Sequence, residues 1–99
     1  MDENDKIYHR HFDQLQDWKE KNKLTTIQEA IFGRILFHMC DNNWSEWTPI
    51  DHIRLMDGLH ITCEEYVKNI NQLESLGLIE YKAEKFKWVT YNLNRNIFH

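Results

Sequence analysis

The hydrophobic pattern of the chain begins with one amphipathic stretch. Four large apolar or aromatic side chains lie about one helical turn apart: Tyr8, Phe12, Leu15 and Trp18. This spacing predicts a helix over 7–21, because residues three or four positions apart share one helix face. The stripe needs a surface to cover it, either the domain's own core or a second copy of the chain. Residues 1–6 are polar and acidic, so we expect a disordered leader there.

Three later segments open with a threonine that is followed three residues on by an acidic side chain. The pairs are Thr26 and Glu29, Thr48 and Asp51, and Thr62 and Glu65. A threonine hydroxyl accepts a hydrogen bond from the first helical turn, and the acidic side chain bonds back to the cap. Pro49 favours the second start, and Gly58 and Gly77 favour helix ends. The pattern therefore predicts three further helices, over 26–41, 49–57 and 63–76.

The distribution of apolar residues within each later segment predicts its place in the fold. The stretch 26–41 is apolar around most of its circumference, which predicts a helix at the centre of the core. Aromatic and β-branched residues alternate with polar ones over 78–81 and 86–91, which predicts an antiparallel hairpin joined by 82–85. The segment 42–47 is expected to form a turn that leads into a short extended piece.

Together these elements predict an α+β, mostly helical fold. The expected order is helix, helix, short strand, helix, helix and hairpin. Two helices joined by a turn at 58–61 and followed by a two-stranded wing form a winged helix-turn-helix, with the helix over 7–21 as an extra N-terminal element. We expect a single domain over 7–94 and a tail over 95–99, because a chain of 99 residues buries one core.

Composition and charge limit the class of protein. Apolar residues make up 41% of the chain and charged residues 28%, which is typical of a folded domain. The net charge of -4 argues against strong non-specific binding to nucleic acid, so any DNA contact must be local. Two cysteines and the absence of a signal-peptide pattern favour the cytoplasm. No apolar run approaches the roughly 20 residues that cross a bilayer, so we expect no membrane partner.

Motifs of catalytic chemistry are absent from the sequence. The chain has no nucleophile elbow, glycine-rich phosphate loop or zinc-protease motif, so we expect no enzyme and no small-molecule substrate. The spacing of His60 and Cys63 could hold zinc, with His38 and Cys40 as further ligands. The paired Cys-x-x-Cys of a structural site is absent, however, and Cys40 lies on a mostly apolar helix. We therefore expect no metal and no cofactor.

Several short motifs lie within 31–91. They are Asn-Trp-Ser-Glu-Trp at 43–47, Thr-Pro at 48–49, Leu-Met before a Gly-Leu-x-Ile turn at 55–61, Leu73, and Leu-Gly-Leu-Ile-Glu-Tyr-Lys at 76–82. With these motifs the stretch resembles the N-terminal winged-helix domain of phage replisome organisers and related primosomal proteins of the DnaD type. The resemblance implies a role in starting DNA replication on a phage, plasmid or other mobile element. It also implies double-stranded DNA and replication proteins as partners.

Candidate DNA contacts lie on the outward face of the helix over 63–76 and on the hairpin. The candidates are Lys68, Asn71, Gln72, Lys82, Lys85 and Lys87. Asn71 and Gln72 can form paired hydrogen bonds with adenine, and Lys68 can meet a phosphate. The alternative is that these polar residues only solvate an exposed face. Lysines on a hairpin also protect its edges from pairing with other chains.

Two hypotheses for the function follow, and charge separates them. The first is a winged-helix DNA-binding module that acts in replication initiation or regulation through the six candidates above. The second is a winged helix that binds protein instead of DNA and acts as a dimeric adaptor, with the stripe of 7–21 as its interface. Glu64 and Glu65 favour a basic partner, although Glu65 is better explained as the capping partner of Thr62. Trp44 and Trp47 fit either the core or a partner contact.

Overall fold

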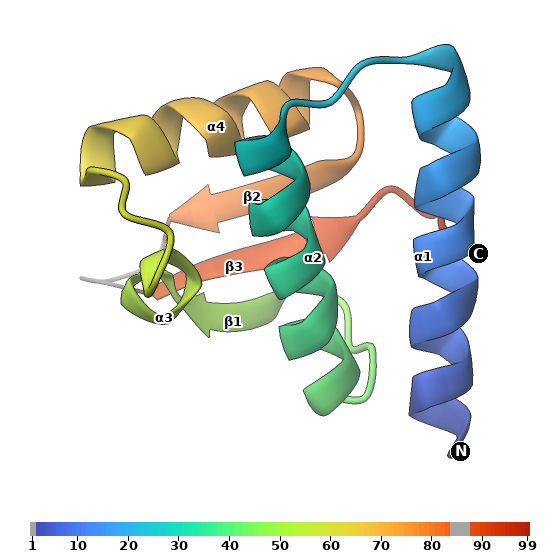
Figure 1. Cartoon of the computed structure of the whole chain (residues 1–99). Coiled ribbons are helices and arrows are strands. Elements are labelled where there is room, and N and C mark those ends of the chain that lie inside the picture. The colour runs from blue at the N-terminus through green and yellow to red at the C-terminus, as the bar shows by residue number, and fades with distance from the viewer. Residues whose placement is uncertain (1, 84–87) are drawn as a thin grey trace.

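The computed structural model describes residues 2–83 and 88–99. Its elements are α1 (Glu3–Lys21), α2 (Thr26–Asp41), β1 (Thr48–Asp51), α3 (His52–Met56), α4 (Cys63–Ser75), β2 (Ile79–Ala83) and β3 (Trp88–Leu93). The predicted α+β class and the predicted order of elements are confirmed (Figure 1). Within the described part of the chain, no helix has the length and apolar character needed to cross a membrane.

Helix α2 lies at the centre of the fold, as its apolar circumference predicts. It contacts α1, α3, α4 and β1, and Figure 1 shows it crossing the sheet with α1 standing beside it. Its buried apolar side chains are Ile31, Phe32, Ile35, Leu36 and Met39. Removing apolar surface from water stabilises a fold by about 25 cal/mol per Å², so this helix is the main source of cohesion among the elements around it.

The described strands form one antiparallel sheet in the order β1–β3–β2. Tyr91 of β3 stands opposite Thr48 of β1 and Tyr81 of β2. Because side chains alternate along a strand, these three point to the face that the helices cover, where Tyr91 and Thr48 are buried. Trp88 and Lys82 lie an odd number of positions from Tyr91 and Tyr81, respectively. Their side chains are therefore exposed on the face of the sheet that the helices do not cover.

Helix α1 begins at Glu3, earlier than predicted. The prediction of a disordered leader over 1–6 is therefore wrong from Glu3 onward. The Asp2 side chain accepts a hydrogen bond from the backbone N–H of Asp5 and caps the first turn. Glu3 and Asp5 also carry negative charge next to the positive end of the helix dipole. The acidic residues that indicated disorder are thus the residues that start the helix.

The helix predicted over 49–57 is wrong in its first part. Thr48 and Pro49 belong to β1, and the Thr48 hydroxyl donates to a backbone carbonyl of the preceding turn instead of capping a helix. Pro49 is tolerated because β1 is an edge strand. Helix α3 starts after Asp51, whose side chain accepts from the backbone N–H of Ile53.

The other two predicted helix starts differ in accuracy. Thr62 and Glu65 form the predicted capping box of α4. Helix α2 uses Thr25 and Gln28 for its capping box, one residue before the predicted pair. Glu29 forms instead a 2.6 Å salt bridge with a lysine of α1.

Two glycines end the helices of the predicted helix-turn-helix. Gly58 follows α3 with a φ of 79°, and Gly77 follows α4 with a φ of 80°. This left-handed backbone suits glycine because it has no Cβ. Arg34 of α2 donates to the carbonyls of Leu55 and Asp57, which satisfies the last turn of the short helix α3.

The C-terminal segment packs against α1. The prediction that 95–99 form a tail outside the domain is therefore wrong. Phe98 is fully buried, and its ring centroid lies 5.3 Å from that of Phe32 in α2 and 5.7 Å from that of His11 in α1. The side-chain amide of Gln14 donates to the backbone carbonyl of the residue that follows Phe98. The segment therefore completes the core beside α1 (Figure 1).

His11 is a buried titratable group at this junction. Its Nδ1 lies 2.8 Å from the side-chain oxygen of Gln14, and its ring meets Trp44 edge to face. Burial lowers the pKa of His11 below its ordinary value of 6.5; the Gln14 hydrogen bond opposes this shift, and the charges of Arg10 and Arg95 add to it. The folded chain therefore binds fewer protons at this site than the unfolded chain, so stability is lost as the pH falls below about 6.5.

We expect Phe98→Ala to lower the free energy of unfolding by about 3–5 kcal/mol, because it removes a fully buried ring. Urea denaturation followed by circular dichroism measures this loss. Arg95→Ala is the matched control: it alters an exposed side chain of the same segment and should change stability by no more than about 0.5 kcal/mol. An equal, small effect of both changes would show that the segment does not belong to the core.

We expect the wild-type chain to be less stable at about pH 5.5 than at about pH 7.5, because His11 must be protonated against its buried surroundings. His11→Leu should reduce this difference. A remainder should persist, since burial also lowers the pKa of His38. The measurement is urea denaturation at both pH values, with the exposed His9→Leu as control. An unchanged pH dependence in His11→Leu would contradict the assignment.

Candidate functional site

Helix α4 buries one face and leaves the opposite face uncovered. Its buried side chains are Tyr66, Ile70 and Leu73. A projection at 100° per residue, the helical period, places four exposed side chains on the other side: Glu64, Lys68, Asn71 and Ser75. We call these four residues the outer face of α4. It is the surface on which the sequence places the groove contacts.

Both amide side chains predicted to contact DNA are already engaged within the chain. The Tyr81 hydroxyl donates to the side-chain oxygen of Asn71, which ties α4 to β2. The Gln28 side chain donates to the side-chain oxygen of Gln72 at 2.6 Å, which ties α4 to α2. Each amide therefore keeps its N–H donors, while its oxygen already accepts a hydrogen bond.

The predicted lysines do not share one surface. Lys68 is exposed in the middle of the outer face of α4. Lys82 is exposed on the opposite face of the sheet, and its Nζ lies 3.9 Å from the centroid of a Trp47 ring. This distance is typical of a cation–π contact, so Trp47 positions Lys82. Lys85 and Lys87 lie outside the described residues.

The two tryptophans before β1 are used inside the chain. Trp44 is half-buried against the core, and its indole N–H donates to the backbone carbonyl of Asn4 at 3.2 Å. Trp47 is half-buried and carries Lys82 over its ring. Of the two alternatives, the structure thus favours intramolecular packing for both rings.

Three exposed apolar side chains on α3, α4 and β3 were not singled out from the sequence. Ile53 is 59% exposed, Val67 52% and Trp88 45%. The helical projection places Val67 on the flank of α4 that faces the hairpin, and Trp88 stands opposite Asp51, just before α3. Apolar residues at these positions fit the pattern of a buried core equally well, so the sequence holds no signal that separates them from it.

A cavity of about 190 Å³ lies between α4 and the hairpin. Its walls are apolar and aromatic, and they include Tyr66, Ile70, Val89 and Tyr91. The hydroxyls of Tyr66 and Tyr91 are hydrogen-bonded to each other. Burial raises the pKa of Tyr66 to about 12 and also raises that of Tyr91, so both phenols stay neutral.

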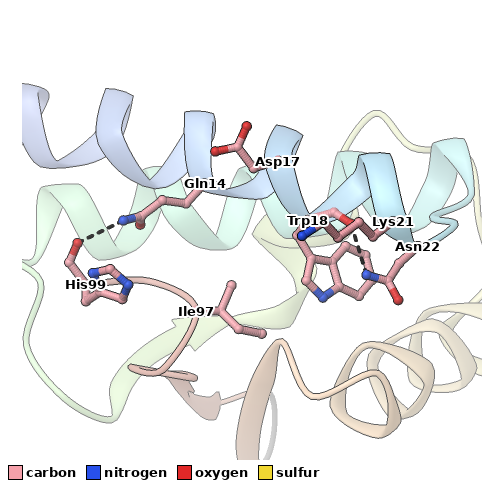
Figure 2. A pocket seen from close by; sticks show the side chains of 7 residues that line it. All are labelled: Gln14, Asp17, Trp18, Lys21, Asn22, Ile97 and His99. Carbon is pink, nitrogen blue, oxygen red and sulfur yellow. Dashed lines mark hydrogen bonds between the residues drawn. The ribbon is translucent and has the colours of Figure 1, made fainter.

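A wide, shallow hollow lies between the second half of α1 and the C-terminal segment (Figure 2). Trp18 and Ile97 provide its apolar part, and the hydrogen bond from Gln14 to the carbonyl of His99 closes one end. Asn22 bends back and donates to the carbonyl of Trp18. The hollow is therefore a seam between two packed segments, with two of its amide side chains bonded within the chain.

The histidines and cysteines do not gather into a metal centre. Within residues 2–83 and 88–99, no three His, Cys, Asp or Glu side chains come together as ligands would. The Cys40 Sγ lies 3.4 Å from the carbonyl of Asn4, and burial, helped by the nearby charge of Asp5, raises the pKa of its thiol. A protonated thiol is a poor nucleophile and a poor metal ligand. Cys63 is exposed.

The predicted interface stripe on α1 mostly covers the chain's own core. Leu15 is 1% exposed, and Tyr8 and Trp18 are half-buried against the same cluster. Phe12 is 40% exposed. Of the four predicted interface residues, Phe12 has the most exposed side chain.

Comparison of the chain with protein-family models, with curated proteins and with solved structures found no match. The geometry of α4 and the hairpin and the sequence resemblance over 31–91 are therefore the basis for a function.

Proposed function

We propose that the chain is a winged-helix module that binds double-stranded DNA and acts in replication initiation or regulation on a phage or mobile element. The order of the elements supports the winged-helix part: α3 and α4 correspond to the helix-turn-helix, and β2 and β3 to the wing. The resemblance of 31–91 to replisome organisers supports the replication part.

The observation that carries this proposal is the uncovered outer face of α4 beside the hairpin (Figure 1). The backbone N–H of Tyr81 donates to the Glu74 side chain at 3.2 Å, and the Tyr81 hydroxyl bonds to Asn71. These bonds hold the hairpin at a fixed position along the helix. A helix exposed in this way fits the major groove, while a neighbouring hairpin can meet the sugar-phosphate backbone.

The positive charges on α4 and on the hairpin set the strength of DNA binding. Lys68 shares the outer face with Glu64, and Lys82 forms a cation–π contact with Trp47. Each phosphate that a protein neutralises steepens the dependence of log K on log salt by about 0.9. Few cations therefore mean weak binding with a shallow salt slope, detectable at low ionic strength.

The amide geometry also limits which bases can be recognised. Adenine presents one acceptor and one donor in the major groove, so an amide must both donate and accept to pair with it. The oxygens of Asn71 and Gln72 each accept one hydrogen bond within the chain, and an amide oxygen has two lone pairs. Each oxygen must therefore accept a second hydrogen bond to pair with adenine, whereas the guanine acceptors N7 and O6 need only the N–H donors.

We expect the double change Lys68→Ala and Lys82→Ala to weaken binding to all duplexes to a similar degree and to reduce the salt slope by about 0.9 for each lost phosphate contact. Fluorescence anisotropy with labelled duplexes at several salt concentrations measures both quantities. Lys6→Ala alters an exposed lysine at the far end of α1 and should leave the slope unchanged. If wild-type protein shows no salt-dependent binding to any duplex at low ionic strength, the proposal fails.

A second candidate is a protein-interaction module that does not bind DNA and acts as a dimeric adaptor. The exposed apolar side chains of Ile53 and Val67, together with the acidic Glu64, favour it. Such a surface fits a partner that is basic and partly apolar. In this candidate, self-association uses the exposed Phe12 of α1.

The adaptor candidate is tested by the mass of the particle in solution. It requires about twice the 12.2 kDa of the single chain in light scattering, reduced to one chain by Phe12→Glu. Phe37→Glu is the matched control, because Phe37 is 56% exposed on α2 and should tolerate the same charge without loss of the dimer. A wild-type chain that is monomeric at high concentration excludes the dimer through α1.

A further inference from the structure

The cavity between α4 and the hairpin has the dimensions of a small-ligand site. Its volume of about 190 Å³ exceeds the roughly 150 Å³ at which an apolar protein cavity binds benzene or xenon. Two helix side chains at its wall, Tyr66 and Ile70, are 4% and 2% exposed, and Tyr91 at the wall is fully buried. Buried core residues therefore form part of the cavity wall, while Val67 is 52% exposed at its edge.

One phenolic proton in this cavity has no acceptor among the described residues. Tyr66 and Tyr91 carry two hydroxyl protons, and the hydrogen bond between the hydroxyls uses one of them. Among the described residues no other hydrogen bond reaches either hydroxyl. Both residues line the cavity, so the spare proton is available to an acceptor placed there. A buried donor without an acceptor costs free energy, so binding of a molecule that accepts this hydrogen bond is favourable.

The lining also determines the charge of the ligand. No charged side chain among the described residues lines the cavity, and transfer of an ion into such surroundings is strongly unfavourable. The raised pKa values of Tyr66 and Tyr91 report the same low polarity. A ligand must therefore be neutral.

From the size, lining and spare proton, we propose that this cavity binds a neutral, single-ring aromatic molecule that carries one hydrogen-bond acceptor. The ring packs against Ile70 and Val89, and the acceptor receives the spare proton of the Tyr66 and Tyr91 pair. Because the walls come from both α4 and the hairpin, a bound molecule stabilises their relative position. The site is separate from the outer face of α4, so the proposal does not depend on DNA binding.

Two probes of equal heavy-atom number test it: acetophenone, which carries an acceptor, and isopropylbenzene, which carries none. Titration of the full chain with each, followed by amide chemical shifts in NMR, should give saturable shifts centred on α4 and β3. In the double change Tyr66→Phe and Tyr91→Phe, acetophenone should bind about five-fold more weakly relative to isopropylbenzene, since one hydrogen bond is lost. The fold should survive, because both hydroxyls are removed together.

A substitution that fills the cavity tests whether the probes bind inside it. Ala83 is exposed on β2 and lines the cavity, so Ala83→Phe should abolish binding of both probes. Glu80→Phe places the same ring on the opposite face of the same strand and should leave binding unchanged. Thermal melts confirm that each variant is folded. Absence of saturable binding by wild type, undiminished binding by Ala83→Phe, or an unchanged probe ratio in the double tyrosine variant would each overturn the proposal.

Discussion

Helix α2 must be covered on nearly all of its sides, and the rest of the fold provides the cover. Its apolar residues leave little circumference that can face water. Leu15 of α1, Leu73 of α4, Ile50 of β1 and Phe98 near the end of the chain all belong to the one cluster around it. Loss of any of these covering elements would expose α2 to water, which is why segments far apart in the sequence depend on each other.

Much of the fold could be predicted because its helices carry their own signals. The period of 3.6 residues, the capping box of Thr62 and Glu65, and Gly77 are local features, and the structure uses them as the sequence indicates. Thr48 and Pro49 show the limit of such signals. The same residues fit a helix start or an edge strand, and the choice is made by pairing with Tyr91, far along the chain. Phe98 is a single ring without periodicity, so no local pattern marks it as core.

For two of the candidate residues, exposure could be predicted from the sequence, but hydrogen bonding could not. The outward direction of Lys68 and Asn71 follows from helical geometry alone, and the structure has both exposed. The partners of the polar side chains come from other elements: Tyr81 for Asn71, Gln28 for Gln72. These contacts depend on the register of β2 and on the angle between α2 and α4, which no single segment encodes. The cavity under α4 has the same origin, since it is space left between elements.

The contact between His11 and Phe98 has a kinetic consequence. Their rings meet although almost the whole sequence separates them, and closing so long a loop costs entropy before the contact returns any stability. Contacts of such high sequence separation slow folding. Helices α1 and α2 are neighbours in sequence and contact each other directly, so they can associate early, whereas the C-terminal segment joins late. In hydrogen exchange the C-terminal segment should then open before the centre does.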